Sequence, residues 1–274
     1  MTGGDAYGHG FGKVWTDVYV HKREGHSTSV RDYHAHGFYE INLILSGNVR
    51  ILLGDYAEEG SGTRIVLTRP GTPHYIACRD DSLYRRIYLN FTEDFVRDHL
   101  SEWRRLSAVF GEKGSSLSLG KEETERFLSL IEEIGREENA LRKRLLIYYL
   151  LSLVSDLSEG EARSATRIPP YLVEVLSYLQ AHYSERIVAE KLADRMHVGR
   201  TTLMTDFKRY TGTTLGEYLT HCRLRRAIAL LSEGATIEYT ALACGFSDGS
   251  GLIRSFKRCY GMTPRRYLES MRMK

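Results

Sequence analysis

The C-terminal part of the chain contains one short pattern twice, and this repeat limits the possible fold more than any other feature. Phe207-Lys208-Arg209 and Phe256-Lys257-Arg258 lie 49 residues apart, and each triplet ends a segment with helical periodicity. A turn marked by glycine precedes each segment, at Gly199 in the first copy and at Gly245 in the second. A helix, a tight turn and a second helix form a helix-turn-helix, whose second helix can enter a DNA major groove. The repeat therefore predicts two such units in one chain.

The whole region after Pro170 is expected to be helical. The predicted helices cover residues 171–183, 188–196, 200–210, 215–232, 237–244, 250–260 and 264–271. The helix over 215–232 lies between the two units and would be about 27 Å long. Successive major-groove faces are about 34 Å apart, so the two second helices would lie in neighbouring groove segments on one side of the duplex.

Positive charge is concentrated in the same region. From residue 168 to the end there are 16 Lys and Arg against 10 Asp and Glu, a net charge of +6, while the whole chain carries +3. Residues 1–167 therefore carry −3. This distribution indicates that an anionic partner would meet the C-terminal part.

The first half of the chain shows the two-residue alternation of β-strands. Residues 40–45 and 49–53 alternate on either side of a turn at Ser46-Gly47-Asn48, and residues 63–68 and 84–91 give further strands. Short strands at regular spacing predict an all-β barrel or sandwich. From Lys121 the spacing becomes helical, which predicts two amphipathic helices whose inward positions are Phe127, Ile131, Ile134, Leu141, Leu145, Tyr148 and Ser152.

These patterns predict an α+β chain with two domains. Residues 1–157 would form a β-barrel with two flanking helices, and residues 168–274 an all-α domain. A polar segment at 158–167 would link them.

The C-terminal half resembles the AraC/XylS-type transcriptional regulators over about residues 171–267. The resemblance is carried by Leu192-Ala193, Tyr218, Arg223-Leu224-Arg225-Arg226-Ala227, Leu230-Leu231, Ala243-Cys244-Gly245-Phe246-Ser247-Asp248, Phe256-Lys257 and Gly261-Met262-Thr263-Pro264-Arg265-Arg266-Tyr267. It implies a tandem helix-turn-helix domain that binds double-stranded DNA.

The resemblance also implies which side chains meet DNA. Base contacts are expected from the second helix of each unit, at Arg200, Thr201, Met204, Thr205, Gly249, Ser250 and Arg254, and phosphate contacts from Lys208, Arg209, Lys257 and Arg258. Arg254 is the strongest candidate for a specific contact, because a guanidinium can pair bidentately with guanine. The alternative for each basic residue is a solvated helix charge. Gly249 and Gly251 stand where larger residues are common, so either that helix starts later than usual or the second unit reads few bases.

A second motif lies in the N-terminal half. His34, His36 and Glu40 fit the pattern H-x-H-x3-E, and His74 follows Pro-Gly-Thr-Pro further along the chain. Residues 34 and 36 point the same way on a strand, and His74 can arrive from a facing strand. Three imidazoles and a carboxylate suit a divalent Zn, Mn, Fe or Ni ion. The pattern resembles the two cupin motifs, although the second is one residue short and Cys78 stands where Asn is common.

The same residues have other interpretations. In AraC-type sensor domains with a cupin-like barrel, such His and Glu side chains can hold a loop by hydrogen bonds or line a sugar pocket. The candidate contacts to a small polar ligand are Tyr33, His34, His36, Tyr39, Glu40, His74 and Tyr88. Tyr33 and Tyr39 would face outward if the register differed by one residue.

Two functions are compatible with these features. The first is a ligand-responsive transcription factor, not an enzyme, whose effector is a small polar molecule such as a sugar. The resemblance implies activation more often than repression, contact with RNA polymerase, and a homodimer formed through the helices within 121–157, which could instead merely cover the barrel. The second is a metal-dependent cupin enzyme fused to a DNA-binding domain, which would need an open coordination position.

The sequence also argues against several other classes. No apolar run approaches the roughly 20 residues of a membrane span, and residues 1–12 lack the apolar core of a signal peptide, so a cytoplasmic protein is expected. The four cysteines contain no C-x-x-C pair, which predicts reduced thiols. No nucleophile-elbow motif or phosphate-binding loop is present.

Overall fold

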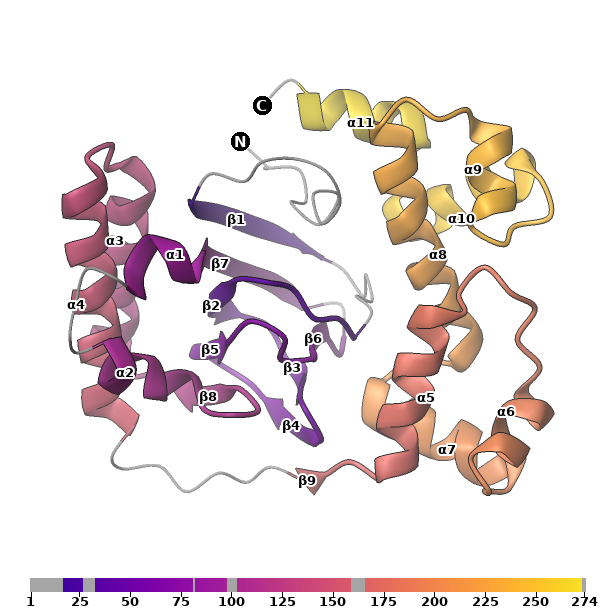
Figure 1. Cartoon of the computed structure of the whole chain (residues 1–274), viewed down its shortest axis with the longest axis horizontal. Helices are drawn as coiled ribbons and strands as arrows, with labels where there is room; N and C mark the ends of the chain where they lie inside the picture. The colour runs from indigo at the N-terminus through magenta and orange to yellow at the C-terminus, as the bar shows by residue number, and fades with distance from the viewer. Residues whose placement is uncertain (1–16, 27–32, 81, 98–102, 159–165, 273–274) are drawn as a thin grey trace.

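Two halves of different architecture lie side by side in the computed structural model, a sheet-rich half and a helical half (Figure 1). The structure describes residues 17–26, 33–80, 82–97, 103–158 and 166–272. The α+β organisation in two domains that the sequence predicts is confirmed. Most of the predicted linker, at 159–165, and the N-terminal segment lie outside the described residues.

Within the described residues, the strands form two sheets. The larger has the order β1-β7-β2-β5-β8 and the smaller the order β6-β3-β4-β9. The strand bounds are β1 Val18–His26, β2 Tyr39–Ser46, β3 Val49–Leu53, β4 Tyr56–Gly60, β5 Arg64–Thr68, β6 His74–Cys78, β7 Leu83–Phe91, β8 Ser115–Ser118 and β9 Thr166–Arg167.

The sheets pack face to face but do not close into the predicted barrel. Their facing sides share one apolar cluster that includes Ile44 and Val66 of the larger sheet with Ile51 and Ile76 of the smaller. Closure would require the outer strands of the two sheets to pair with each other. Instead, β4 pairs with β9, a strand formed by the last two residues of the predicted linker. The result is an open sandwich.

Alternation along the strands separates two environments. On β2, Ile41 and Leu43 point to the outer face and join the main core of this half, while Glu40 and Asn42 point between the sheets. The helices α3 (Lys121–Arg136) and α4 (Ala140–Ser158) cover the outer face and close that core. The short helices α1 (Glu93–Val96), α2 (Trp103–Leu106) and η3 (Ser107–Phe110) complete it.

The two predicted amphipathic helices are confirmed, but Tyr148 alone among the inward positions predicted for α4 is buried. Leu141 and Leu145 are 60% and 56% exposed, and Tyr149 is 47% exposed, whereas Ile147 and Leu151 form the buried side. α4 is rich in apolar residues around much of its circumference, so periodicity alone could not choose the buried side.

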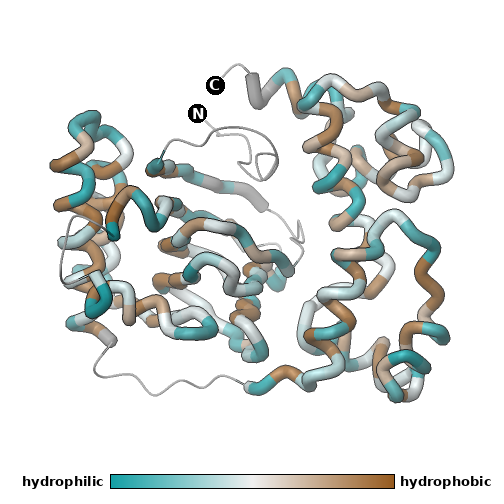
Figure 2. The backbone as a smooth tube through the Cα atoms, viewed as in Figure 1, coloured by the Kyte–Doolittle hydropathy of each residue, from teal (hydrophilic) through white to brown (hydrophobic). Residues whose placement is uncertain are grey.

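The helical half matches the predicted helices closely. Its elements are α5 Pro170–Ala181, α6 Ala189–Arg195, α7 Arg200–Thr211, α8 Leu215–Ser232, α9 Ile237–Ala243, α10 Gly249–Tyr260 and α11 Pro264–Arg272. α8 runs between the two repeated units (Figure 1). It starts with a capping box formed by Thr214 and Glu217. In Figure 2 the helices of both halves alternate between brown and teal segments, as amphipathic helices do.

The helical half has two cores, and one of them extends into the sheets. Leu203, Phe207 and Tyr218 form a cluster that also contains Tyr33 and Tyr75 from the sheet-rich half. A second cluster, around Leu252 and Phe256, uses only residues from 224 onward. No helix among the described residues is long and apolar enough to cross a membrane.

Candidate nucleic-acid interface and sensor site

The first repeated unit consists of α6, a turn and α7. The turn bends at His197, which adopts a left-handed φ of 54°. Gly199 then provides an extended residue at the start of α7. Leu203 and Phe207 point into the core, which leaves the opposite side of α7 exposed. This unit has the geometry of a helix-turn-helix.

The second unit consists of α9, a turn and α10. Gly245 has φ 79°, and a Cβ atom there would lie 2.4 Å from the backbone oxygen of Ser184, so only glycine fits. Asp248 caps α10 by accepting a hydrogen bond from the backbone N–H of Gly251 at 2.7 Å. This bond is the main reason that the pKa of Asp248 is lowered from its ordinary value.

Most of the residues predicted to contact DNA lie on exposed helix surface. These are Arg200, Thr201, Thr205, Lys208 and Arg209 on α7, and Ser250, Arg254, Lys257 and Arg258 on α10. Arg200 forms an ion pair with Glu190 at 3.0 Å, an exposed contact of small net stability that a phosphate could replace.

Two of the residues predicted to contact DNA do not lie on exposed surface. Met204 is partly buried and packs against the first core. Gly249 is buried where α10 packs against α9. A Cβ atom at this position would lie within 2.9 Å of Glu238 and Ile237, so the absence of a side chain allows the two helices to pack closely. α10 begins at Gly249, one residue before the predicted start and 49 residues after the start of α7 at Arg200, so the second helix does not start late relative to the repeat.

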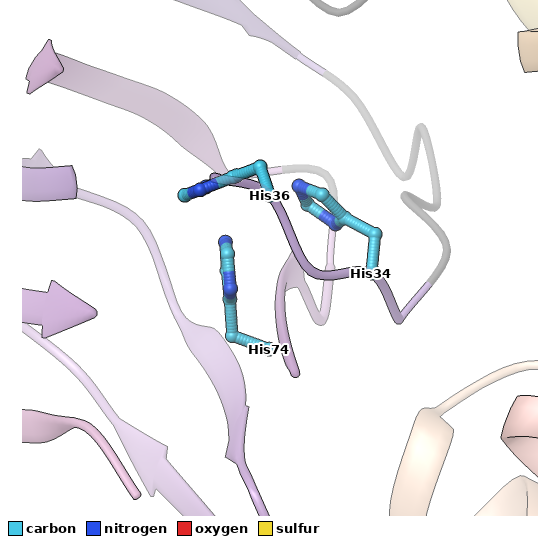
Figure 3. Close-up of side chains that lie close together, drawn as sticks. All are labelled: His34, His36 and His74. Atoms are coloured by element: carbon cyan, nitrogen blue, oxygen red, sulfur yellow. The ribbon is translucent and has the colours of Figure 1, made fainter. Parts of the chain in front are cut away.

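A cluster of histidines lies between the sheets of the other half. His34 forms an isolated antiparallel bridge with His74, the first residue of β6, and His36 follows in the loop before β2. The ring centroids of His34 and His74 are 4.4 Å apart, and those of His36 and His74 are 4.8 Å apart. One ring nitrogen from each residue lies within 4.8 Å of the others (Figure 3). The residues predicted from the two motifs therefore come together.

Glu40 completes the cluster from β2. Its carboxylate oxygens lie 3.6 Å from Nε2 of His36 and 3.4 Å from Nε2 of His74. Asn42 donates a hydrogen bond to Glu40 at 2.5 Å, and Arg86 donates one to Asn42 at 3.0 Å. The predicted group of three histidines and one glutamate is thus assembled from three separate segments.

Burial and the neighbouring groups act on the pKa of Glu40 in opposite directions, and on the pKa of His34 mainly in the same direction. Burial alone would raise the pKa of Glu40, but the adjacent His36 and His74 imidazoles outweigh it and hold this pKa well below its ordinary value. Burial lowers the pKa of His34 well below its ordinary value, and the nearby His74 and Arg225 lower it further. The cluster therefore pairs an ionised carboxylate with at least one neutral imidazole.

Two of the predicted ligand-contacting tyrosines point elsewhere. Tyr39 packs on the outer face of β2 against Phe91 and Phe110. Tyr33 is buried against the helical half, and its hydroxyl donates to the backbone oxygen of Gly54. Both lie one residue from a cluster histidine or glutamate, so strand alternation turns them to the opposite face.

Tyr88 does lie between the sheets. Its ring is tilted against His21, and the guanidinium of Arg86 lies 4.9 Å from the ring centroid. The sequence interpretation missed His21, Asn42 and Arg86, which are buried polar residues on the same inner face. The two-residue alternation of β7 carried a signal for Arg86, because Arg86 shares the parity of Tyr88.

Comparison with known proteins agrees with both halves. Residues 17–151 match the family model described as an AraC-like ligand binding domain, and residues 192–270 match the model described as a helix-turn-helix domain. These models describe parts of a transcription factor, not of an enzyme.

Relatives cover either most of the chain or about half of it. A transcriptional activator named RhaS from Escherichia fergusonii is 24% identical over 85% of this chain and 85% of its own length. RhaS from Citrobacter koseri is 32% identical over 45% of this chain and 44% of its own length. The crystal structure of ToxT from Vibrio cholerae covers 93% of this chain and 98% of that chain, at 12% identity and a TM-score of 0.45.

Proposed function

The chain belongs to the AraC family of transcriptional regulators, and on this premise we propose that its helical half binds promoter DNA under the control of a small molecule held between its two sheets. The observation that carries this proposal is the pair of helix-turn-helix units at the two ends of α8. Each presents an exposed side of its second helix with basic residues at the end, Lys208 and Arg209 on α7 and Lys257 and Arg258 on α10. Basic residues in these positions suit phosphates, and the exposed residues before them suit base edges.

Arg254 is the residue proposed to give most sequence information. It is exposed on α10, and its guanidinium can pair bidentately with guanine O6 and N7. Ser250 and Thr201 occupy matching positions in the two units, 49 residues apart, and are proposed to make weaker base contacts.

The test is selection of bound fragments from genomic DNA at fixed salt, with wild type, Arg254→Ala and Arg265→Ala in parallel. Arg265 is an exposed arginine on α11 that forms an ion pair with Glu269, so it serves as the matched control. We expect wild type and Arg265→Ala to enrich one site about two helical turns long, and Arg254→Ala to accept several bases at one position of it. Binding that is sensitive to salt but blind to sequence would contradict the proposal.

The effector is proposed to be a small polar molecule, such as a sugar, that lies against the inner faces of the sheets. His34, His36, Glu40, His74 and Tyr88 support this proposal because they combine hydrogen-bonding groups with aromatic faces in one buried region. Arg86 and Asn42 extend the same polar surface.

A homodimer is proposed to form through α4. Leu141, Leu145 and Tyr149 are spaced four residues apart and form an exposed apolar stripe on this helix. Leu145→Glu should reduce the dimer fraction in sedimentation experiments without loss of helical signal. The matched change Leu242→Glu, at an exposed leucine on α9 of the helical half, should leave the dimer fraction unchanged if the stripe forms the contact.

Activation is the proposed direction of control, since the relatives named RhaS are activators. A protein that activates a promoter works through RNA polymerase, in the cytoplasm where the DNA lies. A reporter gene joined to the selected site should therefore increase in expression when the protein is supplied.

A further inference from the structure

We propose that His34, His36, His74 and Glu40 bind one divalent transition-metal ion, and that this ion stabilises the contact between the sheets and the first helix-turn-helix unit. The inference rests on the proposed function, because it concerns how the sensor half acts on the DNA-binding half. It adds a metal ion, beside the small polar molecule proposed above, as an effector of this protein.

The orientation of the imidazoles supports a metal site. Nδ1 of His36 lies 3.0 Å from the backbone oxygen of Phe38, and Nδ1 of His74 lies 2.9 Å from the backbone oxygen of Thr72. A carbonyl oxygen can only accept a hydrogen bond, so both Nδ1 atoms carry a proton and donate it. In the neutral ring, this places the lone pair on Nε2. Backbone carbonyls commonly fix metal-binding histidines in this way.

The Nε2 atoms then face an anion. They lie 3.6 Å and 3.4 Å from the two oxygens of Glu40. A lone pair opposite a carboxylate is repulsive unless a cation lies between them. If the cation were a proton on the ring, a charge-assisted hydrogen bond of about 2.7–2.9 Å would be expected. Two ligands of one tetrahedral zinc ion lie about 3.4 Å apart when each bond is about 2.0–2.1 Å long. The separations of His36 and His74 from Glu40 match two ligands of one ion, whereas the histidine nitrogens, up to 4.8 Å apart, would have to move closer together.

The chemistry of the four side chains selects the class of ion. Three imidazoles with one carboxylate suit first-row transition metals such as zinc, nickel, iron and manganese. Magnesium and calcium prefer sets made of oxygen ligands, so they should bind this site poorly. Glu40 supplies the carboxylate of this set, with its two oxygens 3.6 Å and 3.4 Å from Nε2 of His36 and His74.

The metal site is joined to the DNA-binding half through adjacent residues on two bridged segments. His34 and His74 exchange backbone hydrogen bonds at 2.9 Å and 2.8 Å. Tyr33 and Tyr75, the residues next to them, face the helical half. The backbone N–H of Tyr33 donates to the hydroxyl of Tyr218 on α8 at 2.8 Å.

Tyr75 makes the second connection. Its hydroxyl donates to the backbone oxygen of Thr211, at the end of α7, at 3.0 Å. Because successive residues of a strand point to opposite faces, one pair of segments presents two imidazoles to the ion and two tyrosines to the first unit.

The connection through Tyr33 and Tyr75 indicates that a bound ion would strengthen the contact between the sheets and the helical half. A bound ion would draw ring nitrogens that now lie up to 4.8 Å apart to ligand spacing and would hold the bridged segments together. An ion that binds better when Tyr33 and Tyr75 contact the helical half stabilises this contact, which we call the docked arrangement. The contacts of Tyr33 and Tyr75 reach α8 and the backbone at the end of α7, so docking leaves the exposed Thr201 and Thr205 free to meet DNA.

The first experiment measures metal binding by the full chain. Wild type, His36→Ala and His182→Ala are titrated with zinc sulfate by calorimetry, and metal content is measured after dialysis. His182 is a matched control on the helical half, where it pairs with Glu185. We expect one zinc per chain for wild type and His182→Ala, and affinity lower by at least about 100-fold for His36→Ala. Equal binding by all three proteins, or none by wild type, would overturn the proposal, as would magnesium binding as tight as zinc.

The second experiment tests the connection to the first unit. Hydrogen exchange of the segment 200–232 is followed with and without zinc in wild type and in Tyr75→Phe, which loses the bond to Thr211. Zinc should slow exchange several-fold in wild type and have little effect in Tyr75→Phe, which still binds zinc. Because coupling is reciprocal, zinc affinity in Tyr75→Phe should fall by no more than the factor by which zinc stabilises the contact.

The outcomes separate the two proposals. If zinc binds but exchange at 200–232 does not change in wild type, the link between metal and docking is wrong. Specific DNA binding is measured on the same preparations. If zinc binds and slows exchange while no specific DNA site is found, the proposed function fails and the metal site remains.

Discussion

The two helix-turn-helix units share one local plan but are held in different ways. The core of the first unit, around Phe207, includes Tyr33 and Tyr75 from the sheet-rich half. The core of the second, around Phe256, uses only residues of the helical half. A change in the sheets can therefore act on the first unit by direct contact, and on the second through α8 and through the backbone at Ser184, against which Gly245 packs.

The N-terminal caps of the helices also differ between the two units. α6 and α7 begin after Val188 and Gly199, neither of which caps its helix with a side chain. α9 and α10 are capped by the side chains of Thr236 and Asp248. The second unit thus carries its own local stabilisation, whereas the first obtains more of it from packing on the sheets.

The largest expected effect comes from emptying each core in turn. Phe207→Ala and Phe256→Ala should each destabilise the protein by about 3–5 kcal/mol, because both rings are fully buried. Of the two, only Phe207 packs on Tyr218, and the centroids of these two rings lie 5.3 Å apart. The hydroxyl of Tyr218 accepts a hydrogen bond from the backbone N–H of Tyr33 in the sheet-rich half. Urea unfolding would measure the stabilities, and hydrogen exchange of β6 should rise in Phe207→Ala alone. A rise of equal size in both variants would show that the two units are held alike.

The next largest effect is expected in the salt dependence of DNA binding, which tests whether both units contact DNA at the same time. Lys208→Ala and Lys257→Ala remove exposed lysines at matching positions of α7 and α10. If both contact phosphates, each change should reduce the slope of log affinity against log salt by about 1. Binding measured at four salt concentrations would show this. A reduction in only one variant would mean that a single unit binds the backbone.

Removal of the cap of α10 should have a smaller effect. Asp248→Ala should lower the melting temperature by a few degrees, because the N–H of Gly251 loses its acceptor. The pKa of Asp248 is depressed in the folded protein, so its contribution is complete above the unfolded pKa of about 3.9. It is lost as pH falls through the lower folded value. The difference between variant and wild type in thermal melts should therefore shrink below pH 4, and a difference independent of pH would contradict the role of the carboxylate.

The smallest effect is expected from a substitution at Gly199 that would give the first unit a helix cap like those of the second. Gly199 has an extended conformation, and a Cβ atom there would make only an ordinary contact with Thr202 at 3.6 Å. Gly199→Ser would supply the missing cap to α7 and should stabilise the protein by a few tenths of a kcal/mol. Thermal melts of wild type and variant would measure it. A loss of stability would show that the turn needs glycine for another reason.

Local features explain how much of the helical half was predictable. The helix over 215–232 was predicted with its observed bounds, since its apolar periodicity lies within one short segment. The 49-residue repeat predicted both units before any contact was known. The burial of Gly249 could not be predicted, because it depends on contact with Glu238, which belongs to another helix.

The sensor half was predictable only in part. Strand alternation was enough to expect His34, His36, Glu40 and His74 near one another, and the structure brings them together. The alternation could not assign Tyr39, because its side depends on where β2 begins after the loop at His36. Closure of the sheets was also wrongly expected, since β9 arrives from a segment that the sequence marked as linker.

By itself, the sequence determined the local structure of this protein: two helix-turn-helix units, an alternating set of strands and the residues of a buried histidine cluster. These follow from periodicity, caps and turns, which act over a few residues. Only the tertiary structure decided that the sheets stay open, that the exposed stripe of α4 runs through Leu145 and Tyr149, and that Tyr33 and Tyr75 join the cluster to the first unit. These features depend on burial between segments far apart in the chain, and the pattern of a single segment does not contain the surface that will cover it.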